Sequence, residues 1–243
     1  MKAMILAAGK GTRLKPLTDN TPKALVKVNG TPMLEIIIKK LMRTGVNELI
    51  INVHYLSNQI IEFLTSNNNF GLQITISNES NELLDTGGGL KKASHFFNNN
   101  KPFILYNTDI ISNINLQEML DEHIKHKALV TLAVRNRKSS RYFLFNKNLK
   151  LSGWKNTKTS EEIITKKNNN LTCLAFSGIH ILDPKIFKLM PNINKFSIVD
   201  TYLKLSKNYR IHAYDHSQDY WFDVGDITKL NQTQEFLNSK QLS

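Results

Sequence analysis

The sequence contains a single cysteine, Cys173, and seven histidines. One thiol cannot form an internal disulfide bond, which favours a reducing compartment, and we expect the protein to be cytoplasmic. The residues around it, 171–176, are mostly apolar, so we expect a buried structural thiol and not a nucleophile. Because the histidines and the cysteine show no zinc-ligand spacing, the sequence predicts no zinc site.

Long hydrophobic runs are also absent. No apolar run approaches the roughly 18 residues that a membrane-spanning helix needs, so we expect no membrane association. The first residues enter an apolar segment, 3–7, without the pattern of a signal peptide. No linker or repeat divides the chain, and we expect a single domain over residues 1–243.

Acidic residues are scarce: 20 Asp and Glu stand against 32 Lys and Arg, which gives a net charge of +12. This excess raises a basic nucleotide- or nucleic-acid-binding module without catalysis as an alternative function. The basic residues are scattered, however, and the densest group, 135–141, lacks the interleaved aromatic residues of a single-strand platform. We therefore expect anionic small substrates and no nucleic-acid partner, and the sequence leaves a homo-oligomer open.

The first 107 residues alternate between helix and strand patterns. Leu34, Ile37, Ile38 and Leu41 fall on one helical face. Further helices are expected over 57–64, with Ser57 as the cap, and over 88–97; strands are expected over 3–7, 48–53, 72–77 and 102–107. Repeated strand–helix units predict an α/β fold with a doubly wound, mostly parallel, Rossmann-like sheet and helices on both faces. Ligands of such folds gather at the carboxyl ends of the strands.

After an amphipathic helix over 116–124, the pattern becomes β-rich. Strands are expected over 128–135, 142–145, 149–154 and 175–181, and helices over 186–189, 198–205 and 228–237. We interpret the strands as a small β-rich insertion that covers the site. The change of pattern separates a first half, 1–127, from a second half, 128–243.

The loop after the first strand, residues 7–23, reads AAGKGTRLKPLTDNTPK and combines glycines with cations. Gly9 and Gly11 allow backbone amides to approach a ligand closely, as a phosphate cradle requires. The loop is not a P-loop, because Met4 and Gly11 break that pattern, and it is not a dinucleotide fingerprint, because Leu14 replaces the third glycine. The second strand also lacks an acidic ribose clamp, since Asn52 and His54 stand at its end.

The full stretch resembles the signature of the sugar-1-phosphate nucleotidyltransferases. The matching residues are Gly9, Gly11, Thr12, Arg13, Leu14, Pro16, Leu17, Thr18, Pro22, Lys23, Ala24, Leu25, Val26, Gly30, Pro32, Met33 and Leu34. The resemblance implies an enzyme that joins a nucleoside triphosphate to a sugar 1-phosphate and releases pyrophosphate. Among the short members, the N-acetylmuramate 1-phosphate uridylyltransferase branch is most similar, so we favour UTP; a GTP-using enzyme of the mannose-1-phosphate guanylyltransferase type is the alternative.

Three further segments carry the resemblance. Residues 84–89, LDTGGG, place three glycines ahead of a helical stretch, which is costly unless a backbone or a ligand must come close. Residues 106–109, YNTD, depart from the family's N-G-D because Thr108 replaces the glycine. Residues 221–225, WFDVG, match its W-x-D-V-G.

The resemblance implies that residues 1–127 form a nucleotide-binding half and residues 128–243 a sugar-binding half. It also assigns roles to individual residues. It implies catalytic roles for Arg13 and Lys23, which neutralise phosphate charge. Nucleotide-binding positions are Ala7, Ala8, Gly9, Gly11, Thr12, Arg13 and Gly88. Sugar-phosphate-binding positions are Lys23, Asp85, Thr86, Gly87, Asn107 and Gly178. The role of Glu79 and Glu82, as base contacts or exposed loop acids, stays open, and His180 is expected to be structural.

The resemblance also implies Mg²⁺ as cofactor, bound by Asp109 and Asp223. Two nearby carboxylates would repel each other unless a cation lies between them. We therefore expect Asn at either position to leave the ligand-free fold as stable or more stable. Arg13 and Lys23 are expected on a polar loop, where substitution spares the fold. No strong general base is needed, because the attacking phosphate oxygen is already ionised.

Overall fold

The computed structural model describes residues 1–80 and 82–241, and its contacts divide the chain into two compact units. Unit 1 comprises Met1–Leu83, Tyr106–Asn113 and the chain from Trp221 onwards. Unit 2 comprises Leu84–Leu105 and Ile114–Tyr220. The chain passes between the units within strand β6 (Phe103–Asn107). The division into a nucleotide-binding and a sugar-binding half stays a prediction.

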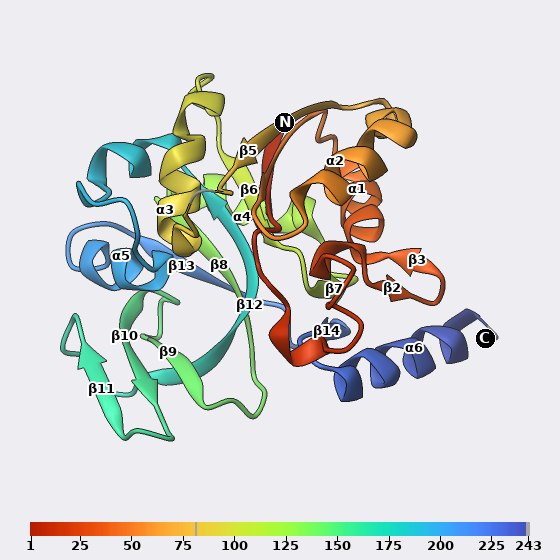
Figure 1. Ribbon diagram of the computed structural model, residues 1–243. Helices are drawn as coiled ribbons and strands as arrows, with labels where there is room; N and C mark the ends of the chain where they lie inside the picture. Colours follow the sequence, from red (N-terminus) through yellow and green to blue (C-terminus); the bar gives the residue numbers. More distant parts are fainter. Residues whose placement is uncertain (81, 242–243) are drawn as a thin grey trace. The chain divides into compact units, whose positions relative to one another are not determined.

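Unit 1 contains a parallel sheet in the order β1 (Lys2–Leu6), β4 (Glu48–Val53), β5 (Gln73–Asn78). Helix α1 (Met33–Arg43) leads into β4, and α2 (Ser57–Ser66) leads towards β5. Both helices lie on the same side of the three strands (Figure 1). The register aligns the carboxyl ends of all three strands, so the loops that follow them emerge at one edge.

The rest of unit 1 is assembled from distant parts of the chain. Strand β14 (Trp221–Asp223) pairs antiparallel with β7 (Ile110–Ser112), and the short hairpin β2 (Lys27–Val28) and β3 (Thr31–Pro32) precedes α1. Helix α6 (Ile227–Gln241) follows β14. An apolar cluster of Leu14, Val26, Val28, Met33, Ile111, Val224 and Leu230 packs these segments together. Three short 3-10 helices complete the unit: η1 (Thr12–Leu14), η2 (Lys23–Leu25) and η3 (Asn68–Gly71).

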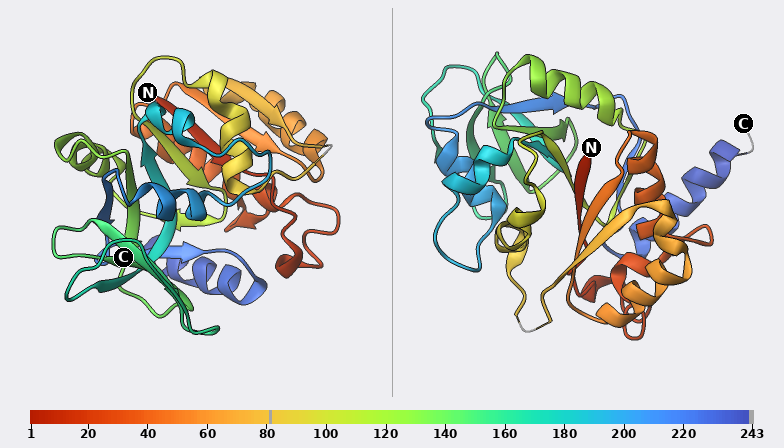
Figure 2. Two further views of the ribbon diagram at one scale, coloured as in Figure 1. Left: turned by 90° about the vertical axis from the view of Figure 1, so that its left-hand side faces the viewer. Right: turned by 90° about the horizontal axis from the view of Figure 1, so that it is seen from above.

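Unit 2 is mainly antiparallel. Its strands are β8 (Val130–Arg135), β9 (Arg141–Phe145), β10 (Leu151–Asn156), β11 (Glu161–Ile164), β12 (Thr172–Leu182) and β13 (Ile211–Asp215). The long strand β12 pairs with both β8 and β9, whereas β13 joins β8 in parallel. Its helices are α3 (Asp85–Lys92), η4 (Ala93–Phe96), α4 (Leu116–Lys125), η5 (Pro184–Leu189) and α5 (Ile198–Leu205). Helix α4 lies along β13 (Figure 2, right view).

The predicted fold class is confirmed: a mostly parallel α/β sheet is joined by a β-rich part. Several local predictions were wrong. Ser57 is the first residue of α2 and not its cap, which is Leu56 in the left-handed region at φ 51°. The strands β11 and β13 were missed. Cys173 is half-buried, so the expected full burial is incorrect.

Among the residues that the structure describes, no helix is both long enough and apolar enough to span a bilayer.

Candidate active site

The carboxyl edge of the unit 1 sheet is held by buried polar contacts. The backbone N–H of Ala7 donates to Asn52 Oδ1 at 2.7 Å, and Asn52 Nδ2 donates to Glu79 Oε1 at 2.7 Å. Asn52 and Glu79 are both almost fully buried. These hydrogen bonds connect the start of the glycine loop to the ends of β4 and β5, and they therefore fix the position at which the loop leaves β1. Glu79 is therefore not an exposed loop acid, whereas Glu82 is exposed.

Gly11 allows the loop to fold back on itself. Its φ is +66°, and a Cβ at this position would lie 2.9 Å from Lys23 Cβ and 3.0 Å from Thr18 Cγ2. Its carbonyl accepts hydrogen bonds from Leu14 N at 2.8 Å and from Thr18 Oγ1 at 2.9 Å. Any side chain would open this turn, so glycine is required for the packing of Lys23 against the loop.

Lys23 lies in this packed turn, and its Nζ is 2.5 Å from Asp109 Oδ2. The Lys23 side chain is only 11% exposed and that of Asp109 21%. This is a partly buried ion pair between segments far apart in the sequence. The expectation that Lys23 occupies an exposed polar loop is therefore wrong, although Arg13 is exposed as expected.

Asp223 lies beside the backbone of Asp109. The pairing of β14 with β7 places Asp223 opposite Ile110, and Val224 N donates to the carbonyl of Asp109 at 2.8 Å. The carboxylate of Asp223 accepts from Lys229 Nζ at 2.9 Å. Two aspartates that are far apart in the sequence thus lie on adjacent backbone segments, and each has a lysine partner.

Arg13 joins the same group. A Cβ built on Gly225 would lie 2.8 Å from Asp223 Oδ1 and 3.0 Å from Arg13 Nη2. Both side chains therefore lie against the backbone of Gly225, which has no side chain to separate them. We call Arg13, Lys23, Asp109, Asp223 and Lys229 the charged cluster.

Lys229 was missed from the sequence. It lies in the first turn of α6, and its backbone N–H donates to Asp226 Oδ1 at 2.9 Å. Its side chain is 41% exposed. In the sequence, Asp226 is typical of a residue that caps the start of a helix, and Lys229 is typical of an exposed lysine in the first turn. The sequence therefore gave no reason to connect Lys229 with Asp223.

Two further polar atoms belong to the residues that directly precede Asp109. Asn107 Oδ1 and Thr108 Oγ1 are buried and have no hydrogen-bond partner within the described part of the chain. Buried oxygens without a partner are uncommon in folded proteins, so both atoms are available for a hydrogen bond. Asn107 is one of the predicted sugar-phosphate-binding residues.

The donor set of the cluster fits Mg²⁺. Mg²⁺ prefers one or two carboxylates together with phosphate oxygens and water, and Asp109 and Asp223 supply two carboxylates from adjacent backbones. In this structure each carboxylate is paired with a lysine ammonium group.

The glycines of the 84–89 segment serve packing in unit 2. The sequence suggested that these glycines precede a helix, but they lie inside α3. The N–H of Gly87 donates to Phe196 O at 2.9 Å, and a Cβ on Gly87 would lie 2.4 Å from the Phe196 ring. A Cβ on Gly88 would lie 2.0 Å from Asn194 O. The close approach of residues 194–196 explains why Gly87 and Gly88 have no side chain, and their predicted roles in ligand binding stay predictions.

Gly88→Ala is expected to destabilise the protein although alanine favours helices. The helix-propensity gain is about 1 kcal/mol, whereas a methyl group placed against a carbonyl oxygen forces a backbone shift that costs roughly 1–3 kcal/mol or more. Urea unfolding measures the difference. The control is Gly9→Ala, where no atom lies within 4 Å of the new Cβ. Equal stability of the two variants would contradict the packing argument.

The remaining predicted residues of unit 2 are near the start of α3 and in β12. Asp85 begins α3 with φ 62°, and Thr86 Oγ1 accepts from Ile198 N at 3.1 Å. Gly178 has φ 77° and lies where the β12–β8 register shifts. Their ligand-binding roles stay predictions.

His180 is a structural residue, as expected. Its Nδ1 is 2.7 Å from the Tyr202 hydroxyl, and both side chains are fully buried. Burial lowers the pKa of His180 to about 3, so the imidazole is neutral at neutral pH.

Known proteins match this chain in sequence over nearly its whole length. The family described as Nucleotidyl transferase matches residues 2–240. The N-acetylmuramate alpha-1-phosphate uridylyltransferase of Neisseria meningitidis serogroup B is 29% identical over 96% of this chain and 97% of its own length. The mannose-1-phosphate guanyltransferase of Kluyveromyces lactis is 31% identical over 98% of this chain, which spans 65% of that protein.

Solved structures have the same fold. The UDP-glucose pyrophosphorylase of Acinetobacter baumanii has a TM-score of 0.78 and 17% identity, covering 99% of this chain and 97% of its own. The inositol-1-phosphate CTP transferase of T. maritima has a TM-score of 0.77 and 16% identity, covering 98% of this chain and 94% of its own. The sequence match over nearly every residue confirms the resemblance inferred from the loop: the chain belongs to the nucleotidyl transferase family.

Proposed function

We propose that this nucleotidyl transferase transfers a nucleoside monophosphate from a triphosphate, preferentially UTP, to a sugar 1-phosphate. A sugar-phosphate oxygen forms a bond to the α-phosphorus, the bond between the α- and β-phosphates breaks, and pyrophosphate leaves with its bonding electrons. The charged cluster carries the proposal, because it combines three cations with two carboxylates beside a glycine loop.

The work of the protein in this reaction is positioning and charge neutralisation. Two anions must approach each other, and oriented cations offset their repulsion. Arg13 and Lys23 would hold the phosphates of the triphosphate, and Lys229 would add a third positive charge near Asp223. Asn107 Oδ1 would accept from a sugar hydroxyl.

Mg²⁺ is the proposed cofactor, held by Asp109 and Asp223. When bound, it would neutralise the charge on the triphosphate and on the leaving pyrophosphate. Lys23 and Lys229, which pair with these carboxylates in the ligand-free protein, would then be free to contact phosphate oxygens.

The preference for UTP is supported by the similarity to the Neisseria uridylyltransferase, which is 29% identical over 96% of this chain. Both classes are present among the relatives, so GTP is the alternative substrate. We further propose a cytoplasmic location, where nucleoside triphosphates are available.

A substrate matrix tests the proposal. Pyrophosphate release is measured for four nucleoside triphosphates and several sugar 1-phosphates, N-acetylmuramate 1-phosphate included, with and without Mg²⁺. We expect release only when metal, triphosphate and sugar phosphate are all present, and the fastest release with UTP. Release at the same rate without sugar phosphate would mean hydrolysis and would reject transfer. Faster release with GTP would reject only the choice of UTP.

A further inference from the structure

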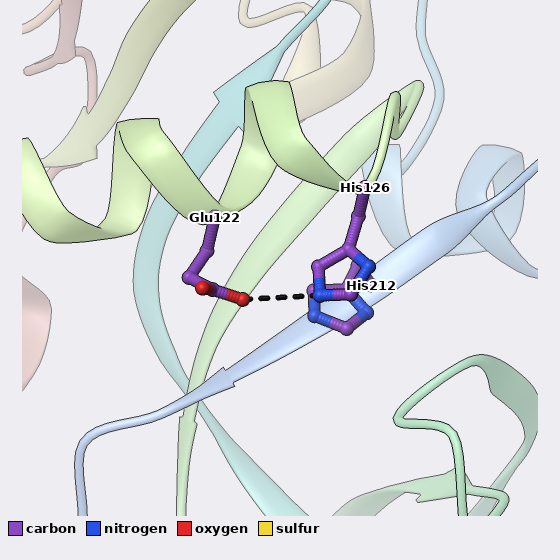
Figure 3. A group of neighbouring side chains, drawn as sticks. All are labelled: Glu122, His126 and His212. Carbon is purple, nitrogen blue, oxygen red and sulfur yellow. Dashed lines mark hydrogen bonds and ion pairs between the residues drawn. The ribbon is translucent and has the colours of Figure 1, made fainter.

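Unit 2 contains a group of side chains that the proposed reaction does not use: Glu122, His126 and His212. Glu122 lies in the last turn of α4, His126 directly follows that helix, and His212 lies in β13. One ligand atom from each residue lies within 4.8 Å of the other two. Figure 3 shows the carboxylate and the two imidazoles gathered at one place.

We propose that these three residues bind one Zn²⁺ or a similar divalent transition-metal ion. Two imidazole nitrogens and one carboxylate oxygen form a common ligand set for zinc, and this set leaves a position open for water. It differs from the all-oxygen set of Asp109 and Asp223, which suits Mg²⁺. The inference therefore stands independently of the proposed transferase reaction.

The burial of His212 provides a second observation. The residue is only 3% exposed, yet its Nδ1 has no hydrogen-bond partner within residues 1–80 and 82–241. Its ring lies against that of His126, with the centroids 4.0 Å apart. Bringing two imidazoles together while one buried nitrogen lacks a partner is costly. A metal ion shared by the two rings would explain the arrangement.

Side chains must rotate before the three ligand atoms can bind one ion, because the rings of His126 and His212 lie against each other. Ligand atoms at about 2.1 Å from a common zinc ion are no more than roughly 4.2 Å apart. Glu122 Oε2 and His126 Nε2 are already 3.0 Å apart, and their side chains are 30% and 28% exposed, so both have freedom to rotate. His212 is fixed in the sheet and would act as the anchor.

Two cations beside Glu122 and His126 oppose metal binding. Lys125 Nζ pairs with Glu122 Oε1 at 2.7 Å, but its side chain is 67% exposed and can leave at little cost. Arg210 Nη1 donates to His126 O at 3.0 Å and lies 3.3 Å from His126 Nδ1. When His126 binds through Nε2, the proton moves to Nδ1, so Arg210 keeps its bond to the carbonyl and releases the ring.

The test is zinc binding by the full chain, stripped of metal with a chelator and then kept in excess Mg²⁺ to occupy carboxylate sites. Zn²⁺ is titrated in competition with a chromophoric chelator. We expect one bound Zn²⁺ per chain and a higher melting temperature on binding. Glu122→Gln and His126→Ala should each weaken binding by roughly 10²-fold or more, since even the loss of a supporting contact costs 10–100-fold.

His95→Ala is the matched control, because His95 is an exposed histidine of the same unit. It should bind Zn²⁺ like the parent protein. Glu122 and His126 are partly exposed, so their variants should fold, and circular dichroism checks this; the buried His212→Ala is a further variant that the conclusion does not require. Failure of the parent protein to bind Zn²⁺, or binding that survives both substitutions, would overturn the proposal.

Discussion

Asp109→Asn and Asp223→Asn are each expected to nearly abolish nucleotide transfer, although the two residues are far apart in the sequence. Each removes a carboxylate from the proposed Mg²⁺ site, and asparagine is a much weaker ligand for this ion. Steady-state pyrophosphate release over a range of Mg²⁺ concentrations measures the loss and the change in metal dependence.

A double-mutant cycle tests whether the aspartates share one ion. Residues that serve a single ion act as a unit, so the double variant should be little slower than either single variant. Their adjacent backbones, joined by the bond from Val224 N to the carbonyl of Asp109, make this sharing geometrically reasonable. If the losses of transfer rate were additive, the two carboxylates would have separate roles. If Asp223→Asn were fully active, Asp223 would not belong to the site.

The free energy of unfolding should distinguish Asp109→Asn from Asp223→Asn. The expectation that asparagine would leave stability unchanged or raise it ignored the lysine partners. Asp109→Asn leaves the buried Lys23 without a counter-charge, which should cost about 1–3 kcal/mol. Asp223→Asn affects Lys229, which is 41% exposed, so the loss should be within about 1 kcal/mol. Urea unfolding without ligands that showed equal losses would contradict this assignment.

The main elements of the fold could be predicted from the sequence because the burial of one face of a helix or strand gives its apolar residues a regular spacing. The strand expected over 48–53 is found as β4 (Glu48–Val53), and the helix around 34–41 is α1 (Met33–Arg43). Strand β11 (Glu161–Ile164) was missed because all four of its residues are exposed, so no burial pattern marks it.

The contacts of the charged cluster could not be predicted. The motifs identified Lys23 and Asp109 separately, but their ion pair depends on how Gly11 closes the loop onto Lys23. Similarly, the sequence left Glu79 open between a base contact and an exposed loop acid, and its burial beside Asn52 on a neighbouring strand depends on the fold. Such pairings are set by the tertiary fold, which brings together residues that have no fixed spacing in the sequence.

The histidines illustrate the same limit. The sequence predicted no zinc site because no ligand spacing is present. Glu122 and His126 have the spacing of one helical turn, but His212 joins them only because β13 runs beside α4. A ligand set assembled from a helix and a distant strand leaves no motif.

Lys23→Met is expected to lower kcat by roughly 10²-fold or more with little change in KM, the scale for losing one preorganised charge. In the proposed reaction, Lys23 leaves Asp109 and neutralises charge that develops on the phosphates, so it acts mainly on the transition state. Methionine preserves the apolar stem that packs against Gly11, whereas alanine would also leave a cavity.

The comparison with Arg13→Ala separates chemistry from stability. Arg13 is exposed, so its loss should reduce kcat without destabilising the fold. Lys23→Met should also destabilise, because Asp109 loses its partner, and adding Asp109→Asn should recover part of that stability but none of the activity.

Lys15→Ala is the control for both variants. This lysine belongs to the same loop, but its side chain is 62% exposed and pairs only with Asp19 at its surface among the described residues. Its kinetics should match those of the parent protein. If Lys23→Met instead raised KM with kcat unchanged, the lysine would bind substrate and transition state equally. Its ion pair with Asp109 would then hold the loop in place, and charge neutralisation during transfer would rest on Arg13 and Lys229.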